Sequence, residues 1–288
     1  YLPDVQQNYA DHVYQNAYNA YWLANFAYPD WDMFQSHDPR AEFHAAARAA
    51  SGGPVYVTDE HGRERAEVLR PLAFSDGRLL MLDEPGQVTR DTLLRDAALE
   101  PVPLKVFGRV TRPGTTAGVV AAFNVNKSAA RVTGELRAAD VEGLVAPGGD
   151  ATRERVAVYR RSDGRVFVLG GAGGDSLPVS LAEAGFDFFT LAPVADGVAV
   201  FGLLDKYVGA AAVVSVRRAA GAVEVRLREA GDFGAWVERP PARVELDGRA
   251  LPPSAYSYAG GLLRVPASSF GAGRGERALR VRLARGGR

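Results

Sequence analysis

The stretch that decides the fold is YPDWDMFQSHDPRAEFHAAARAASGGPVYVTD, which covers residues 28–59. It contains a short apolar segment, an alanine-rich segment and a second apolar segment that ends in Thr-Asp. Asp38 and Pro39 are typical of a helix start, and Gly52 and Gly53 are typical of a helix end. The order strand, helix, strand predicts a parallel strand pair with a right-handed crossover.

Polar residues follow or interrupt the two apolar segments, for which we expect strands over residues 26–34 and 54–58. In parallel sheets and barrels, ligands bind near the carboxyl ends of the strands. A carboxylate accepts hydrogen bonds from sugar hydroxyls, and an indole covers the apolar side of a sugar ring. The residues that this rule brings to a site are Asp30, Trp31, Asp32, Thr58 and Asp59.

Two alternatives stay open for the Asp-Trp-Asp motif. In the first, Asp30 and Asp32 only end a strand and form a turn, with no ligand. In the second, they hold a divalent metal and a nucleotide diphosphate, as in some glycosyltransferases, although no phosphate-binding loop lies nearby. Because that support is missing, we expect no metal and no cofactor.

Composition narrows the function classes. The 288 residues have zero net charge, which gives no indication of a nucleic-acid or membrane partner. Cysteine is absent, so thiolate sites and disulfides are excluded. Basic residues are 31 Arg and 3 Lys, a bias typical of a GC-rich bacterial genome. No apolar run reaches the ~18 residues of a membrane span, and no signal peptide opens the chain, so we expect a cytoplasmic protein.

The chain changes character near residue 100. Before it, residues 4–25 predict a helix that Asp4 can cap and an aromatic stripe expected to pack in the core. After it, short apolar segments separated by turn residues predict an antiparallel β-sandwich. The ten expected strands are 104–110, 118–125, 155–161, 165–170, 186–194, 197–204, 222–229, 242–248, 262–270 and 278–284. Trp236, the one Trp of this half, is expected in the core.

The motif at residues 28–59 resembles the raffinose synthase and seed-imbibition family of α-galactosidase-like glycosidases. The similarity continues more loosely through LLMLDEPGQVTRDTLLRDA at 79–97 and through 104–126. The resemblance implies the last strands and helices of a (β/α)8 barrel over residues 1–98 and an antiparallel β-sandwich over 99–288. It also implies a retaining reaction on α-galactosides such as raffinose-family sugars, which needs two carboxylates ~5–5.5 Å apart.

The resemblance implies that neither catalytic carboxylate is in this chain. Family members carry them in Lys-x-Asp and Ser-x-Asp motifs, and Tyr1-Leu2-Pro3 looks like the residues that follow the second motif. The chain would then be the C-terminal part of a parent enzyme and inactive by itself.

What the resemblance leaves in this chain is the substrate-binding edge. Asp32 would accept hydrogen bonds from galactose hydroxyls, and Met33 would pack near the ring. Trp31 would shape the pocket or cover the face of the sugar, Asp30 would orient Trp31 or the turn, and Asp59 is a weaker candidate.

Composition favours hydrolysis over the alternative, galactosyl transfer of the raffinose synthase type. A third alternative is a non-catalytic carbohydrate-binding or structural module that uses residues beyond 100. The expected partner is an α-galactoside or another small carbohydrate, and the oligomeric state is not indicated.

Overall fold

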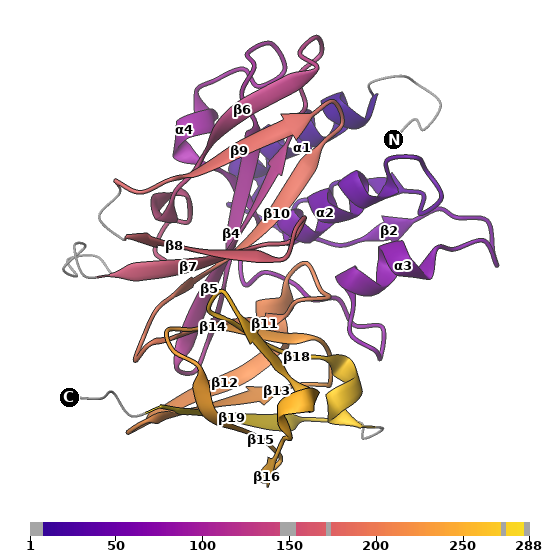
Figure 1. Ribbon diagram of the computed structural model, residues 1–288. Helices are drawn as coiled ribbons and strands as arrows, with labels where there is room; N and C mark the ends of the chain where they lie inside the picture. The colour runs from indigo at the N-terminus through magenta and orange to yellow at the C-terminus, as the bar shows by residue number, and fades with distance from the viewer. Residues whose placement is uncertain (1–7, 145–153, 171–173, 272–274, 285–288) are drawn as a thin grey trace.

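The computed structural model describes residues 8–144, 154–170, 174–271 and 275–284 (Figure 1). The described chain opens with two helices and a parallel strand pair, and most of the remainder is antiparallel sheet. Within these ranges no helix is both long and apolar enough to cross a membrane. The short helices are α3 (Ala66–Leu69), α4 (Arg90–Leu93), η1 (Arg70–Leu72), η2 (Ala138–Asp140), η3 (Gly209–Ala212), η4 (Pro253–Ala255) and η5 (Ala267–Phe270).

Helix α1 (Asn8–Leu23) confirms the first predicted helix, and the proposed cap Asp4 lies outside the described residues. Its aromatic stripe packs against the core only in part, through Tyr14 and Tyr18. Tyr21 and Trp22 are 49% and 67% exposed. The buried face is made mostly of small side chains, which let the helix approach its neighbours closely: Tyr9, Ala10, Val13, Ala17 and Ala20.

Strands β1 (Met33–Phe34) and β2 (Tyr56–Val57) pair in parallel on either side of helix α2 (Ala41–Ser51), which confirms the strand–helix–strand unit. Both strands are shorter than expected. Pro29 lacks the N–H that a ladder needs, and Asp32 has a φ of 62°, which no regular strand adopts.

Helix α2 differs from the prediction at its amino end and agrees with it at its carboxyl end. Asp38 Oδ1 accepts the Arg40 N–H at 2.6 Å, so the expected cap closes a turn and the helix begins at Ala41. At the other end Gly52 has a φ of 69°, the left-handed conformation that the sequence predicted there.

A six-stranded antiparallel sheet forms the centre of the molecule. In sheet order its strands are β3 (Gln87–Val88), β4 (Leu104–Arg112), β5 (Thr115–Phe123), β10 (Phe186–Pro193), β7 (Arg155–Arg160) and β8 (Arg165–Gly170). The edge strand β3 precedes residue 99, so this sheet crosses the expected domain boundary. The division into 1–98 and 99–288 stays a prediction.

Three further antiparallel sheets complete the fold. The first pairs β6 (Arg131–Leu136) with β9 (Leu177–Ala182). The second has the order β11 (Val198–Leu203), β14 (Phe233–Val237), β18 (Leu262–Val265) and β17 (Ser257–Ala259). The third has the order β12 (Val213–Ala219), β13 (Ala222–Leu227), β19 (Arg277–Leu283), β15 (Pro241–Leu246) and β16 (Arg249–Ala250).

The central sheet is covered on both faces. Helix α2 packs on one face, where the Phe43 and Phe123 rings meet edge to face at 5.0 Å. The pair β6–β9 covers the other face through side chains such as Val120 and Leu181. Strand β5 is therefore buried along most of its length. Trp236 is 8% exposed in a small apolar cluster, so its predicted core role is confirmed.

All ten predicted strands of the second half are present, and the pairs among them are antiparallel. The β-rich character of this half is confirmed. The described residues contain one parallel strand–helix–strand unit, so the (β/α)8 barrel and the two-sheet sandwich stay predictions.

Candidate functional site

The Asp-Trp-Asp motif forms a tight turn directly before β1. The Asp32 N–H donates to Asp30 Oδ1 at 2.8 Å, and the Met33 N–H donates to Asp32 Oδ1 at 2.7 Å. These two bonds stabilise the positive φ of Asp32, a conformation that short polar side chains tolerate better than most. Asp30 therefore orients the turn and Asp32.

Arg48 of helix α2 holds the backbone of this turn through hydrogen bonds to two of its carbonyls. Its side chain is buried, and its guanidinium donates to the carbonyl oxygens of Asp32 at 3.2 Å and Met33 at 2.9 Å. A charged donor on a buried carbonyl forms a strong hydrogen bond, so Arg48 couples the helix to the start of the strand.

Two histidines flank the same guanidinium. Arg48 Nη1 lies 3.0 Å from His44 Nδ1, and Nη2 lies 3.2 Å from His12 Nδ1. Because a guanidinium has no acceptor, both Nδ1 atoms must accept, which leaves each ring proton on Nε2. His12 Nε2, which carries the ring proton, lies 3.3 Å from Asp32 Oδ2 and faces that carboxylate.

Burial and the Arg48 charge keep both rings neutral at physiological pH. Burial is the larger cause and Arg48 the next: together they lower the pKa of His12 to about 4 and that of His44 to about 2. Asp32 is therefore oriented by a neutral imidazole and keeps its own negative charge.

The exposed part of the site consists of Asp32 and Met33. The Asp32 side chain is 38% exposed and Met33 is 42% exposed. Trp31 is fully buried and has no hydrogen-bond partner for its Nε1 among the described residues. Its ring can shape the site from behind but does not present a face to solvent.

Asp59 lies elsewhere on the unit. It follows β2, whereas Asp30 and Asp32 precede β1, so the motif and Asp59 are at opposite ends of the parallel pair. Asp59 Oδ1 accepts the Ser36 N–H at 2.7 Å and lies 2.8 Å from His37 Nδ1. The structure therefore brings Asp30, Asp32 and Met33 together, and it places Asp59 in a contact that joins the two strand ends.

Sequence reasoning missed His12 and Arg48. His44 is a buried histidine at 1% exposure, and sequence reasoning assigned no functional role to it or to Arg48. The four-residue spacing of His44 and Arg48 on the predicted helix puts both on one face, and that spacing was the available signal. Among the described residues, no group of three or more His, Asp or Glu side chains is placed to hold a metal ion.

Residues 5–263 match the family model described as raffinose synthase or seed imbibition protein Sip1. The chain therefore belongs to this family, and the resemblance seen in the sequence is confirmed.

The curated relatives are plant proteins. The chain is 32% identical to probable galactinol–sucrose galactosyltransferase 6 of Arabidopsis thaliana, over 87% of this chain and 36% of that protein. It is 31% identical to galactinol–sucrose galactosyltransferase of Oryza sativa, over 88% and 34%. The chain thus spans about a third of the length of these relatives. They give no support to the bacterial source that composition favoured.

Among solved structures, alpha-galactosidase I from Mortierella vinacea shows a TM-score of 0.38 and 12% identity, over 56% of this chain and 38% of that chain. The likeness is too distant to carry an argument about this fold.

Proposed function

We propose that this chain takes part in galactosyl transfer of the raffinose synthase type on small carbohydrates. The observation that supports transfer is that relatives covering most of this chain bear galactosyltransferase names. Hydrolysis, which composition favoured, becomes the second candidate because these relatives are named for transfer and not for hydrolysis.

Asp32 is the residue proposed to bind galactose. A carboxylate has two oxygens and about four acceptor positions. The carboxylate of Asp32 is oriented by a hydrogen bond from the Met33 N–H and by the His12 ring that faces it. Solvent reaches this side chain, which is 38% exposed on a turn that Asp30, Arg48 and His12 hold in place. A rigid acceptor loses little entropy when a hydroxyl binds, which favours recognition of vicinal sugar hydroxyls.

Met33 supplies the apolar half of the proposed contact. Its exposed thioether lies next in the chain to Asp32 and can pack against the C–H side of a sugar ring. Tyr56, its register partner on β2, is 49% exposed and extends the apolar surface. Such a surface favours a sugar acceptor over water, because the acceptor buries C–H groups and water does not.

The two catalytic carboxylates that retention requires are not assigned to residues of this chain. In transfer, a sugar hydroxyl attacks the galactosyl-enzyme, and in hydrolysis water does so. The test is an assay of the whole protein with galactinol as donor and sucrose as acceptor. Transfer gives a galactosyl-sucrose trisaccharide, and release of free galactose alone would favour hydrolysis.

A further inference from the structure

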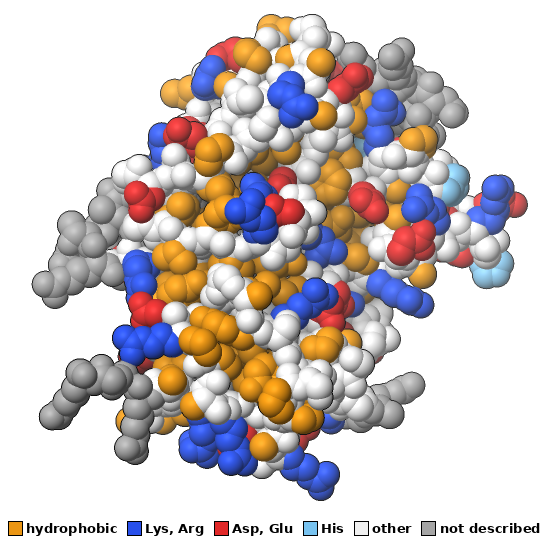
Figure 2. Space-filling model, in the orientation of Figure 1, with side chains coloured by type: hydrophobic (Ala, Val, Ile, Leu, Met, Phe, Trp, Pro, Cys, Tyr) orange, Lys and Arg blue, Asp and Glu red, His pale blue; other side chains and the backbone are white. Residues whose placement is uncertain are grey.

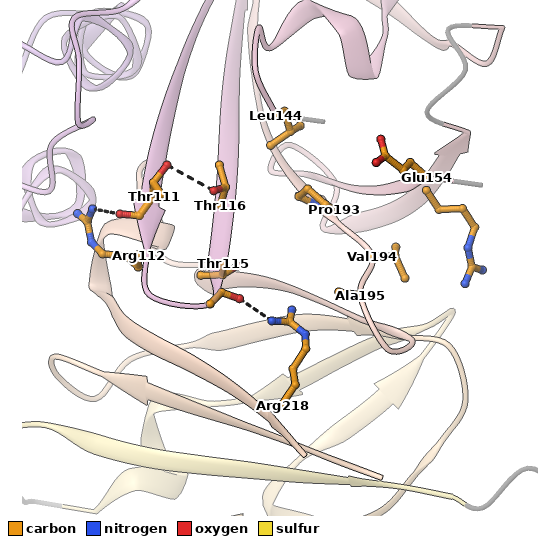
Figure 3. A pocket seen from close by; sticks show the side chains of 12 residues that line it. Thr111, Arg112, Thr115, Thr116, Leu144, Glu154, Pro193, Val194, Ala195 and Arg218 are labelled. Carbon is orange, nitrogen blue, oxygen red and sulfur yellow. Dashed lines mark hydrogen bonds between the residues drawn. The ribbon is translucent and has the colours of Figure 1, made fainter. Parts of the chain in front are cut away.

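A cavity lies at the tip of the β4–β5 hairpin, far along the chain from Asp32. Its volume is about 520 Å3, which is within the range of small-molecule pockets. Figure 3 shows Thr111, Thr115 and Thr116 of the hairpin on one side and Pro193 and Val194 on the other. The start of β7 and strand β12 close the remaining sides.

Two charged side chains on these walls each have one buried polar atom without a hydrogen-bond partner among the described residues. Glu154 contributes Oε2, a buried acceptor, and Arg218 contributes Nε, a buried donor. In Figure 3 they lie at opposite ends of the cavity. A buried polar group without a partner is costly, so native proteins normally satisfy it with protein, water or ligand. The walls thus require one donor and one acceptor.

Each of the three arginines that line the cavity has an acidic side chain nearby. Arg112 donates to Asp83 at 2.7 Å, and Arg155 lies 2.8 Å from Glu238. Arg218 donates through Nη1 to the Gly114 carbonyl and is 4.0 Å from Asp196. Burial lowers the pKa of Arg218, and Asp196 opposes that effect. Because each of these arginines has an acidic neighbour and Glu154 adds a negative charge, the cavity is suited to a neutral ligand more than to an anion.

The rest of the cavity wall is partly polar and partly apolar. Hydroxyl groups come from the hairpin threonines, where Thr116 Oγ1 lies 3.4 Å from Thr111 Oγ1. Apolar surface comes from Leu144, Pro193 and Val194. A sugar ring matches such a pocket because its hydroxyls both donate and accept, while its C–H faces pack on apolar side chains.

We propose that this cavity binds a neutral sugar of one or two rings, with Arg218 donating to a sugar oxygen and Glu154 accepting from a sugar hydroxyl. This site shares no residue with the Asp30–Asp59 region, and it does not depend on the activity proposed above. It would give the β-rich half of the chain a carbohydrate-binding role of its own.

The test is an NMR titration of the 288-residue chain with galactose and with sucrose. We expect at least one of these sugars to shift the amide signals of Thr116 and Val194. Arg218→Met and Glu154→Gln, on opposite walls, should each weaken that binding about tenfold. Arg217→Met is the matched control, because Arg217 is the exposed neighbour on the same strand and does not line the cavity.

Further variants distinguish binding in this cavity from binding at Asp32 and from a general effect of surface charge. Asp32→Asn should leave the cavity shifts unchanged, since it alters only the site before β1. Thr116→Val replaces either charge variant if that variant shows a lowered unfolding temperature. The proposal is overturned if neither sugar shifts these signals, if Arg217→Met weakens binding as much as Arg218→Met, or if sulfate displaces the sugar.

Discussion

The strand–helix–strand unit and the central sheet stabilise their strands by different means. Strands β1 and β2 have two residues each, and the carbonyls at the start of β1 are bound by a buried arginine. Strands β4 and β5 have nine residues each and are held by apolar side chains on both faces. The first arrangement leaves the Asp32 carboxylate at the surface, and the second forms the packed core beside it. Figure 2 shows one face of the molecule with side chains coloured by type.

The difference is sharpest for polar contacts. Arg48 contacts three carbonyls and two imidazoles, so a single side chain holds the turn, helix α2 and helix α1 together. Contacts in the central sheet are many, weak and individually replaceable. We therefore expect the candidate site to depend on single residues much more than the sheet does.

The largest expected effect comes from Arg48→Met. It keeps the apolar stem but leaves the Asp32 and Met33 carbonyls without their buried donor, and we expect a loss of about 3–5 kcal/mol in the free energy of unfolding. Chemical denaturation measures it. Arg63→Met is the control, because the Arg63 side chain is 69% exposed and its loss should cost less than about 0.5 kcal/mol. Equal losses for the two variants would contradict the role of Arg48.

Acid should destabilise the strand–helix–strand unit through its histidines. The folded pKa values of His12 and His44 lie below the ordinary 6.5, so the unfolded chain binds more protons below that pH. Their contribution is complete above about pH 6.5 and is lost as the pH falls, down to about 4 for His12 and about 2 for His44. Near pH 5 the loss is about 2 kcal/mol per histidine.

Unfolding measured between pH 7 and 5 tests this expectation. His12→Gln should reduce the slope of stability against pH. His61→Gln should leave the slope unchanged, because His61 is fully exposed. A slope that His12→Gln does not alter would show that other groups cause the acid sensitivity.

The contact between the two regions should be sensitive to a single methyl group. A Cβ at Gly86 would lie 1.9 Å from the Ala50 carbonyl oxygen of helix α2, a backbone atom that cannot turn aside. Gly86→Ala should therefore cost about 1–3 kcal/mol. The matched control is Gly174→Ala, where a Cβ meets nothing within 4 Å. Thermal unfolding that ranks the two variants equally would refute close packing at Gly86.

The smallest expected effect is that of Asp30→Ala. This change removes the acceptor for the Asp32 N–H at an exposed turn, which should cost about 0.5–1.5 kcal/mol. Asp30→Asn is the matched control, because it keeps an oxygen that can accept the Asp32 N–H. If both variants lose the same stability, the charge of Asp30 and not its hydrogen bond is responsible.

Local pattern predicted much of the fold. Ten apolar segments became strands, and Gly52 ended helix α2 in the expected conformation. Strands β6 and β9 were missed because Gly134 and Pro178 interrupt them and are typical turn residues. These two strands are stabilised by packing on the outer face of the central sheet. The local sequence does not encode that contact.

The site was predicted in part. Asp30, Asp32 and Met33 do lie together, but Asp59 does not join them because β1 begins after the motif, which leaves the motif at the amino end of the strand. The aromatic stripe of α1 was predicted in part, because the fully buried face of that helix is made mostly of small residues and Tyr21 and Trp22 stay exposed. Long-range contacts such as Arg48 with His12 join residues 36 apart, which no local pattern predicts.

The central claim is that Asp32, held by His12 and Arg48, binds a galactosyl group. The most direct test is a titration of the 288-residue chain with galactinol, followed by NMR of the Asp32 and Met33 amides. We predict shifts at these amides and binding about tenfold weaker in Asp32→Asn, with no change in Asp76→Asn. Unaltered affinity in Asp32→Asn, or the absence of any shift at Asp32 and Met33, would contradict the account.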